Sequence, residues 1–237
     1  MAKRAAANPE VVAADVQLFQ IPIVLMLKNY IAEALGTFAL VFFGTGAVVV
    51  NELTGGTVTH VGIALTFGLI VMAMIYTFGD KSGAHLNPAV TIGFALHQVF
   101  PKRLVVPYIV SQLAGAFAAS AVLKLLFPAS LYLGATLPSG TNLQSFVLEV
   151  ILTFFLMLTI INVSQSGKEK GLFAGIAVGS VVLLEALFAG PICGASMNPA
   201  RSLAPAFISG HFQTVWIYIA APVAGAAFAV IVSKQIK

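Results

Sequence analysis

Long apolar stretches separated by short polar segments follow one another along this chain. A helix needs about 20 apolar residues to cross the hydrocarbon core of a membrane. Six stretches come close to that length or exceed it: 31–50, 61–78, 104–126, 146–163, 172–188 and 215–232. Charged residues are rare within them, as is typical of membrane-spanning segments. The pattern predicts an all-α membrane protein with six transmembrane helices.

Two shorter apolar segments each begin with the same tripeptide. Asn-Pro-Ala occurs at Asn87, Pro88 and Ala89 and again at Asn198, Pro199 and Ala200. Asn is favoured as a helix N-cap and Pro at the first helical position, so each tripeptide predicts the start of a helix. The apolar runs 88–96 and 199–207 would cover only about half of a ~30 Å hydrocarbon core. We therefore expect two re-entrant half-helices that reach the middle of the membrane.

The chain is also an internal repeat. Glu33 and Glu149 hold matching places in similar segments, and the two Asn-Pro-Ala loops match as well. The repeats cover about 30–126 and 145–233, and each contains three of the predicted spans. An odd number of spans per repeat forces the two halves into opposite orientations. This predicts an inverted 3+3 repeat whose substrate path runs between the halves.

Composition and charge agree with a membrane protein. Charged residues make up 8% of the chain, against about 25% in soluble proteins. With six spans, most Lys and Arg residues fall on one side of the membrane: Lys3, Arg4, Lys28, Lys81, Lys102, Arg103, Lys168, Lys170, Lys234 and Lys237. Only Lys124 and Arg201 fall on the other side. The positive-inside rule makes the first side cytoplasmic, so the net charge of +4 reflects topology and not nucleic-acid binding.

These patterns define one domain with two tails. Neither half could close a pore alone, so we interpret residues 30–233 as a single channel domain. Residues 1–29 and 234–237 are then the N-terminal and C-terminal tails, both on the cytoplasmic side of the cell membrane.

The two Asn-Pro-Ala loops carry a more specific resemblance. Residues 82–90 read Ser-Gly-Ala-His-Leu-Asn-Pro-Ala-Val, and residues 194–202 read Gly-Ala-Ser-Met-Asn-Pro-Ala-Arg-Ser. Both segments resemble the signature loops of the aquaporin (major intrinsic protein) family, over a match that runs from about Tyr30 to Val232. Segment 188–198 is most similar to the nodulin-like branch, whose members pass glycerol and neutral metalloid acids. The resemblance implies a homotetramer in the lipid bilayer that conducts small neutral solutes without a cofactor.

The paired Asn residues suggest how a pore could pass neutral molecules and oppose cations. If the side-chain oxygen of each Asn caps its helix, we expect the amide NH₂ group to be free to face the lumen. The two helix N-termini would also bring partial positive charges of about half a unit each to the same place. Capping alone is the plainer interpretation of each Asn. The duplication within an inverted repeat favours a pore role in addition.

Arg201 breaks the symmetry of the repeat, because Val90 stands at the equivalent position. An arginine at this depth is costly unless it faces water or a polar cavity. The family resemblance groups Arg201 with Phe67, Ala186 and Ala195 as a selectivity filter. Water-selective members carry His and Cys or Thr where this chain has its two alanines. The resemblance therefore implies a wider and less polar filter, although Phe67 departs from the nodulin-like pattern.

Three acidic residues lie within the predicted spans: Glu33, Glu149 and Glu185. One interpretation is a proton relay, which would indicate a coupled transporter. The other is that Glu33 and Glu149 accept hydrogen bonds from the backbone of the re-entrant loops, the role that the resemblance implies, and we favour it. Glu185 has no partner in the other repeat and no assigned role. His85 is expected to pack within the first loop.

The leading functional hypothesis is a passive channel for water and small uncharged solutes that excludes protons and ions. Glycerol, urea and boric or arsenous acid are the candidate solutes besides water. A secondary transporter of a small solute, also built on an inverted repeat, is the alternative. A non-conducting adhesion role is a third, which the intact Asn-Pro-Ala and Arg set argues against. The sequence shows no nucleophile–base set, so an enzyme is not expected, and its scattered His residues predict no metal site.

Overall fold

The computed structural model of the chain describes residues 23–164 and 172–236. Most of the predicted N-terminal tail lies outside the described residues. So do five of the basic residues used above to assign the cytoplasmic side: Lys3, Arg4, Lys168, Lys170 and Lys237.

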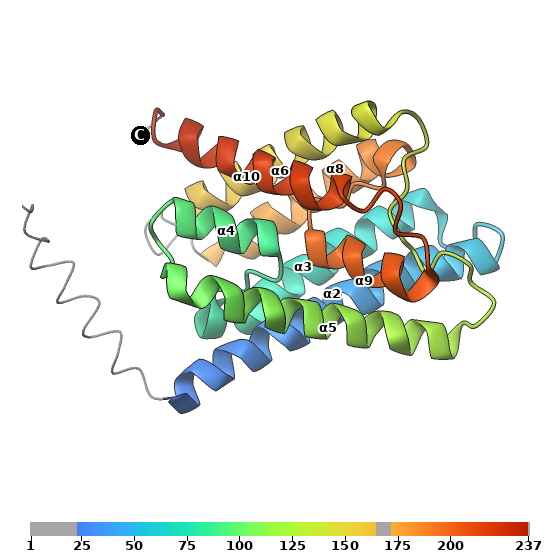
Figure 1. The fold of residues 1–237 in the computed structure, drawn as a ribbon, viewed down its shortest axis with the longest axis horizontal. Helices are drawn as coiled ribbons and strands as arrows, with labels where there is room; N and C mark the ends of the chain where they lie inside the picture. The colour runs from blue at the N-terminus through green and yellow to red at the C-terminus, as the bar shows by residue number, and fades with distance from the viewer. Residues whose placement is uncertain (1–22, 165–171, 237) are drawn as a thin grey trace, which may run out of the picture.

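Helices make up the regular structure of the described residues (Figure 1). The long ones are α2 (Ile23–Leu53), α3 (Thr59–Ser82), α5 (Val105–Leu126), α6 (Asn142–Ser164), α8 (Ala174–Cys193) and α10 (Ile217–Ser233). The short ones are α4 (Pro88–Leu96), α9 (Pro199–Ser209) and the 3-10 turn η1 (Lys102–Leu104). The all-α fold with six long helices and two half-length helices confirms the prediction.

Two helix ends differ most from the predicted spans. α2 begins at Ile23, inside the segment predicted as a tail, because apolar residues already precede Lys28. α8 continues through Pro191 to Cys193, five residues past the predicted end at 188. By length and composition, five of the helices could cross a membrane, whereas α10 is shorter with 17 residues.

The two halves of the molecule pack in the same way. Gly115 of α5 lies so close to Ala34 of α2 that a Cβ at this glycine would collide with the Ala34 carbonyl oxygen. Gly225 of α10 meets the carbonyl oxygen of Val150 of α6 in the equivalent manner. Small residues allow such close approach of helix backbones in membranes. The repeat seen in the sequence is therefore a repeat of helix packing as well.

α3 and α8 join the two halves to each other. Gly68 of α3 and Gly179 of α8 each contact the carbonyl oxygen of the other, and neither leaves room for a side chain. The half-helices α4 and α9 both lie between α5 and α10 (Figure 1), and each contacts both of these helices. The loops that precede α4 and α9 meet in the interior of the molecule, where the candidate site lies.

Candidate functional site

The two re-entrant loops follow the same uncommon backbone course. Each starts where a long helix ends at a left-handed glycine, Gly83 (φ 86°) after α3 and Gly194 (φ 85°) after α8. Two further residues in each loop have a positive φ: Ala84 (46°) and Leu86 (53°), then Ala195 (40°) and Met197 (52°). Residues other than glycine seldom adopt this conformation, and it persists only where the surroundings hold it.

Both Asn residues cap the half-helices that follow them. Asn87 Oδ1 accepts a hydrogen bond from Ala89 N at 2.9 Å. Asn198 Oδ1 accepts from Ala200 N at 3.0 Å and from Arg201 N at 3.3 Å. Both Asn backbones are extended, and Pro88 and Pro199 occupy the first helical positions. This is the N-cap geometry that Asn-Pro favours.

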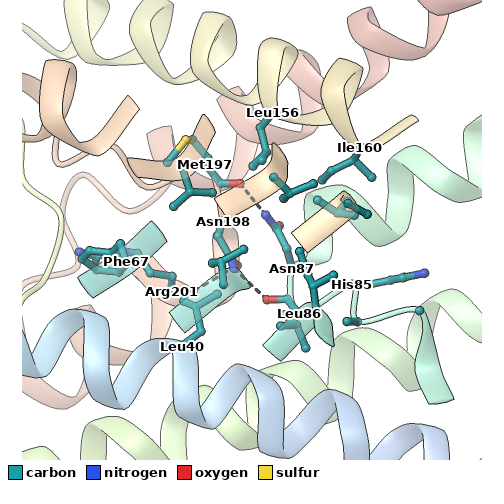
Figure 2. Close-up of a pocket in the computed structure, with 18 of the residues that line it drawn as sticks. Leu40, Phe67, His85, Leu86, Asn87, Leu156, Ile160, Met197, Asn198 and Arg201 are labelled. Carbon is teal, nitrogen blue, oxygen red and sulfur yellow. Dashed lines mark hydrogen bonds between the residues drawn. The ribbon is translucent and has the colours of Figure 1, made fainter. Parts of the chain in front are cut away.

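The amide groups of the same two residues tie the loops together. Asn87 Nδ2 donates to Met197 O at 2.7 Å, and Asn198 Nδ2 donates to Leu86 O at 2.9 Å (Figure 2). An amide NH₂ group carries two hydrogens, so one hydrogen of each remains for another acceptor. The expectation that the NH₂ groups are free to face the lumen was therefore wrong for one hydrogen of each group. The carbonyls that accept these bonds belong to the positive-φ residues Leu86 and Met197.

Glu33 supports the first loop from α2. Its side chain is fully buried and accepts from the backbone N–H groups of His85 at 2.9 Å and Leu86 at 2.8 Å. Ser82 Oγ donates to it at 2.7 Å and Gln112 Nε2 at 2.8 Å. Four donors thus converge on one buried carboxylate, which satisfies loop N–H groups that would be costly to bury without partners.

Glu149 of α6 holds the equivalent position behind the second loop. It is fully buried and accepts from Ser196 N at 2.7 Å and Met197 N at 2.8 Å. Cys193 Sγ lies 3.5 Å from one of its oxygens, where the first half has the Ser82 hydroxyl. Tyr218 OH also donates to the Cys193 carbonyl oxygen at 2.7 Å. The carboxylate holds the loop backbone with fewer side-chain donors than Glu33 has.

His85 lies within the first loop and is buried against aromatic rings. Its ring centre is 4.7 Å from those of Phe94 and Phe100 and 5.1 Å from that of Tyr108. Its Nδ1 atom is 3.1 Å from Thr91 Oγ1. These contacts fix the ring beside the loop.

Arg201 lies at the start of α9 and is almost fully buried. Its Nη1 atom donates to the carbonyl oxygen of Gly134 at 2.8 Å, and its Cζ atom lies 4.9 Å from the ring centre of Phe67. Phe67 in turn packs against Gly44 of α2. Among the described residues, Arg201 Nε has no hydrogen-bond partner. Nothing in the sequence identified Gly134 as the residue whose carbonyl binds Arg201.

A cavity of about 110 Å³ is lined by both Asn residues of the tripeptides and by Phe67, His85 and Arg201. Figure 2 shows Asn87 and Asn198 at its centre, Phe67 and Arg201 toward one side and His85 toward the other. Ala186 and Ala195 line the same cavity, as does Arg201. Apolar side chains form much of the remaining wall: Leu40, Val71, Leu156, Ile160, Val178 and Val182. Such a cavity offers hydrogen bonds at a few places along an otherwise apolar path.

Glu185 remains without an assigned contact. It lies on α8 beside Ala186, is 8% exposed, and neither of its carboxylate oxygens has a hydrogen-bond partner among the described residues. The described part of the chain also contains no group of three or more His, Cys, Asp or Glu side chains arranged to hold a metal ion.

Comparison with known proteins gives consistent matches. The family model described as major intrinsic protein matches residues 20–233. Aquaporin NIP1-3 of Oryza sativa subsp. japonica is 52% identical over 200 residues, which cover 84% of this chain and 70% of that protein. Nodulin-26 of Glycine max is 49% identical over 201 residues, or 84% of this chain and 74% of that protein. The X-ray structure of the aquaglyceroporin from Plasmodium falciparum superimposes with a TM-score of 0.79 at 29% identity, covering 89% of this chain and 97% of that one.

Proposed function

Because the chain belongs to the major intrinsic protein family, whose members are channels and not enzymes, we propose that it conducts water and small uncharged solutes passively and excludes protons and ions. The observation that carries this proposal is the convergence of both Asn-Pro-Ala loops and Arg201 on one cavity between the two halves. A solute in this cavity would exchange hydrogen bonds with water for hydrogen bonds with fixed donors.

Ion exclusion would rest on the charge of the cavity centre. The N-termini of α4 and α9 both face it, and each carries a partial positive charge of about half a unit. Arg201 adds a full positive charge within an otherwise apolar wall. Coulomb repulsion is several-fold stronger in a low-dielectric site than in water. A cation or a proton would therefore meet a barrier that a neutral molecule does not meet.

The solute range would be set at Phe67, Ala186, Ala195 and Arg201, which we propose as the selectivity filter. The two alanines contribute only methyl groups to the cavity wall. Such a wall leaves more room than a His and a Thr would. Glycerol, urea and boric or arsenous acid are thus proposed solutes besides water. The likeness to proteins named nodulin-26 and aquaglyceroporin supports this range.

We further propose a homotetramer in the cell membrane with both termini cytoplasmic. Exposed apolar side chains cover the outer faces of the long helices, for example Leu69 of α3, Phe155 of α6 and Leu184 of α8. Lipid or neighbouring subunits would cover such faces. The distribution of Lys and Arg supports the orientation.

Stopped-flow light scattering on proteoliposomes tests the function, with water, glycerol, urea and boric acid in turn. Linear, uncoupled flux of water and glycerol is expected. Ala186→His should lower the glycerol flux far more than the water flux, because water in single file needs less width. Overpacking can also destabilise the bundle by ~1–3 kcal/mol, so each variant is first checked for folding. Saturable, proton-dependent uptake would contradict a channel, and wild-type protein impermeable to glycerol would contradict the wide filter.

A further inference from the structure

The connector, residues 127–141 between α5 and α6, is anchored to the first half of the molecule at its beginning. Ser130 Oγ donates to Glu52 Oε2 at 3.0 Å, and the side chain of Leu133 is fully buried. Gly134 (φ 68°) packs against Thr45 of α2 so closely that a Cβ would lie 2.9 Å from the Thr45 carbonyl oxygen. The course of the connector up to Gly134 is therefore fixed by α2.

The next residues of the connector are anchored to the second half. Thr136, which is 4% exposed, donates from Oγ1 to Ser202 Oγ of α9 at 2.7 Å. Its methyl group lies against Gly194, where an added Cβ would come within 2.8 Å. Ser139 donates from N to the Ile192 carbonyl oxygen at 3.0 Å and from Oγ to that of Pro191 at 2.8 Å. The connector thus joins α2 to the start of the second re-entrant loop.

The Gly134 carbonyl lies between these two sets of anchors, and it accepts the Arg201 Nη1–H at 2.8 Å. Arg201 is on α9 one residue before Ser202, which Thr136 holds. The Thr136–Ser202 bond therefore fixes the distance between the carbonyl and the helix that carries the guanidinium.

In the first half of the molecule, a different residue supplies the donor that Thr136 supplies in the second half. There, Thr91 of α4 is held by Gln112 of α5, whose Nε2 atom donates to Thr91 Oγ1 at 2.9 Å. In the repeat, Ser202 stands where Thr91 does and Pro222 stands where Gln112 does. Proline has no side-chain donor, so α10 cannot hold Ser202 as α5 holds Thr91. The donor comes from the connector instead.

We propose that Thr136 is a positioning residue that sets the place of the Arg201 guanidinium through Ser202 and the Gly134 carbonyl. This rests on the proposed function, in which Arg201 belongs to the selectivity filter. Thr136 itself touches no solute. Thr136 keeps the Arg201 side chain at one position in the cavity wall. Loss of the Thr136 hydroxyl would therefore change which solutes pass, and not only the yield of folded protein.

Full-length protein in proteoliposomes tests the proposal through the ratio of glycerol to water permeability and through proton leak measured with a pH-sensitive dye. Thr136→Val keeps the shape and the methyl contact but removes the hydroxyl. We expect it to change the ratio by about threefold or more, the size of effect that losing one buried hydrogen bond can give. Thr136→Ser keeps the hydroxyl and should retain the wild-type ratio. Thr57→Val, at an exposed threonine between α2 and α3, is the matched control and should behave as wild type.

Ser202→Ala removes the same hydrogen bond from the other side, together with the hydrogen bond between the Ser202 and Ser196 hydroxyls, and should change the ratio at least as much. Adding Thr136→Val to Ser202→Ala should change the ratio little further, because Ser202→Ala already deletes the Thr136–Ser202 hydrogen bond. A folded Thr136→Val channel with the wild-type ratio and no leak overturns the proposal, even if its yield is low. If Thr136→Val does not fold, Ser202→Ala decides in the same way. Wild-type protein without neutral-solute flux would instead contradict the proposed function itself.

Discussion

The two re-entrant loops share one frame and differ in what supports it. In both, a buried glutamate accepts two consecutive backbone N–H groups and an asparagine caps the half-helix while bonding to the opposite loop. In the first loop the additional donors to the frame come from its own half, from Ser82 and Gln112. In the second loop, Thr136 of the connector supplies a donor that α10 cannot provide.

The same comparison distinguishes the positions that support the loop backbone from the position that differs between the loops. The positions that hold the backbone are repeated, whereas the position after the tripeptide changes from Val90 to Arg201. The backbone supports are repeated in both loops, but only the second loop carries an arginine. The positive side chain therefore lies on one side of the cavity centre only (Figure 2). We infer that the first loop mainly supports the centre of the pore, whereas the second supports the centre and also carries the filter. The filter therefore depends on contacts between the halves.

The largest effect is expected from the two buried glutamates. Gln has the size of Glu but offers a single acceptor oxygen, so Glu33→Gln and Glu149→Gln each leave buried donors unpaired. We expect losses of roughly 1–3 kcal/mol in the free energy of unfolding, the cost of leaving a buried donor without its acceptor. Glu33→Gln should cost more, because Glu33 binds four donors.

These losses in the free energy of unfolding can be compared by thermal unfolding of the detergent-solubilised variants, monitored by size-exclusion chromatography. Glu185→Gln is the matched control, since no described residue donates to Glu185. It should cost little. The comparison of the loops fails if Glu149→Gln costs clearly more than Glu33→Gln, or if the control costs as much as either.

Much of this fold could be predicted from the sequence because short-range sequence patterns indicate it. Apolar stretches of spanning length predict the long helices, and Asn-Pro predicts the starts of α4 and α9. The repeat was enough to pair Glu33 with Glu149. These features need only neighbouring residues or a fixed offset, so they can be seen without knowing how the chain folds back on itself.

The contacts that complete the site could not be predicted because they depend on the path of the backbone. The positive φ of Leu86 and Met197 belongs to residues that rarely adopt it, and nothing in their identity signals it. Each of their carbonyls accepts one hydrogen of an Asn amide group that had been expected to be free. Likewise, Gly134 meets Arg201 across 67 positions of the chain, through a connector that has no regular periodicity.

Arg201→Val would make the second loop resemble the first and so tests what the asymmetry does. Removal of a fixed charge from a low-dielectric site should weaken cation repulsion several-fold. Neutral-solute flux should persist or rise, and a proton or cation leak should appear. A pH-sensitive dye in proteoliposomes under a pH gradient detects the leak, with Val90→Ala in the first loop as the control that should stay ion-tight. A folded Arg201→Val channel that blocks neutral solutes and remains ion-tight would show that the filter lies elsewhere.

The smallest effect is expected where the loops differ by a single atom. Ser82 Oγ donates to Glu33 at 2.7 Å, whereas Cys193 Sγ lies 3.5 Å from Glu149, and a thiol is the weaker donor. Cys193→Ser should therefore raise the free energy of unfolding by about 0.5–1 kcal/mol, and Ser82→Cys should lower it by a similar amount. Cys193→Ala separates the hydrogen bond from side-chain size, because it removes the donor as well as the sulfur. Solute flux should stay at the wild-type level in all three, since none of these side chains lines the cavity among the residues that the structure describes. If Cys193→Ser is no more stable than Cys193→Ala in thermal unfolding, the serine and the cysteine do not play equivalent parts, and the support of the second loop rests on its backbone contacts with Glu149 and on the connector.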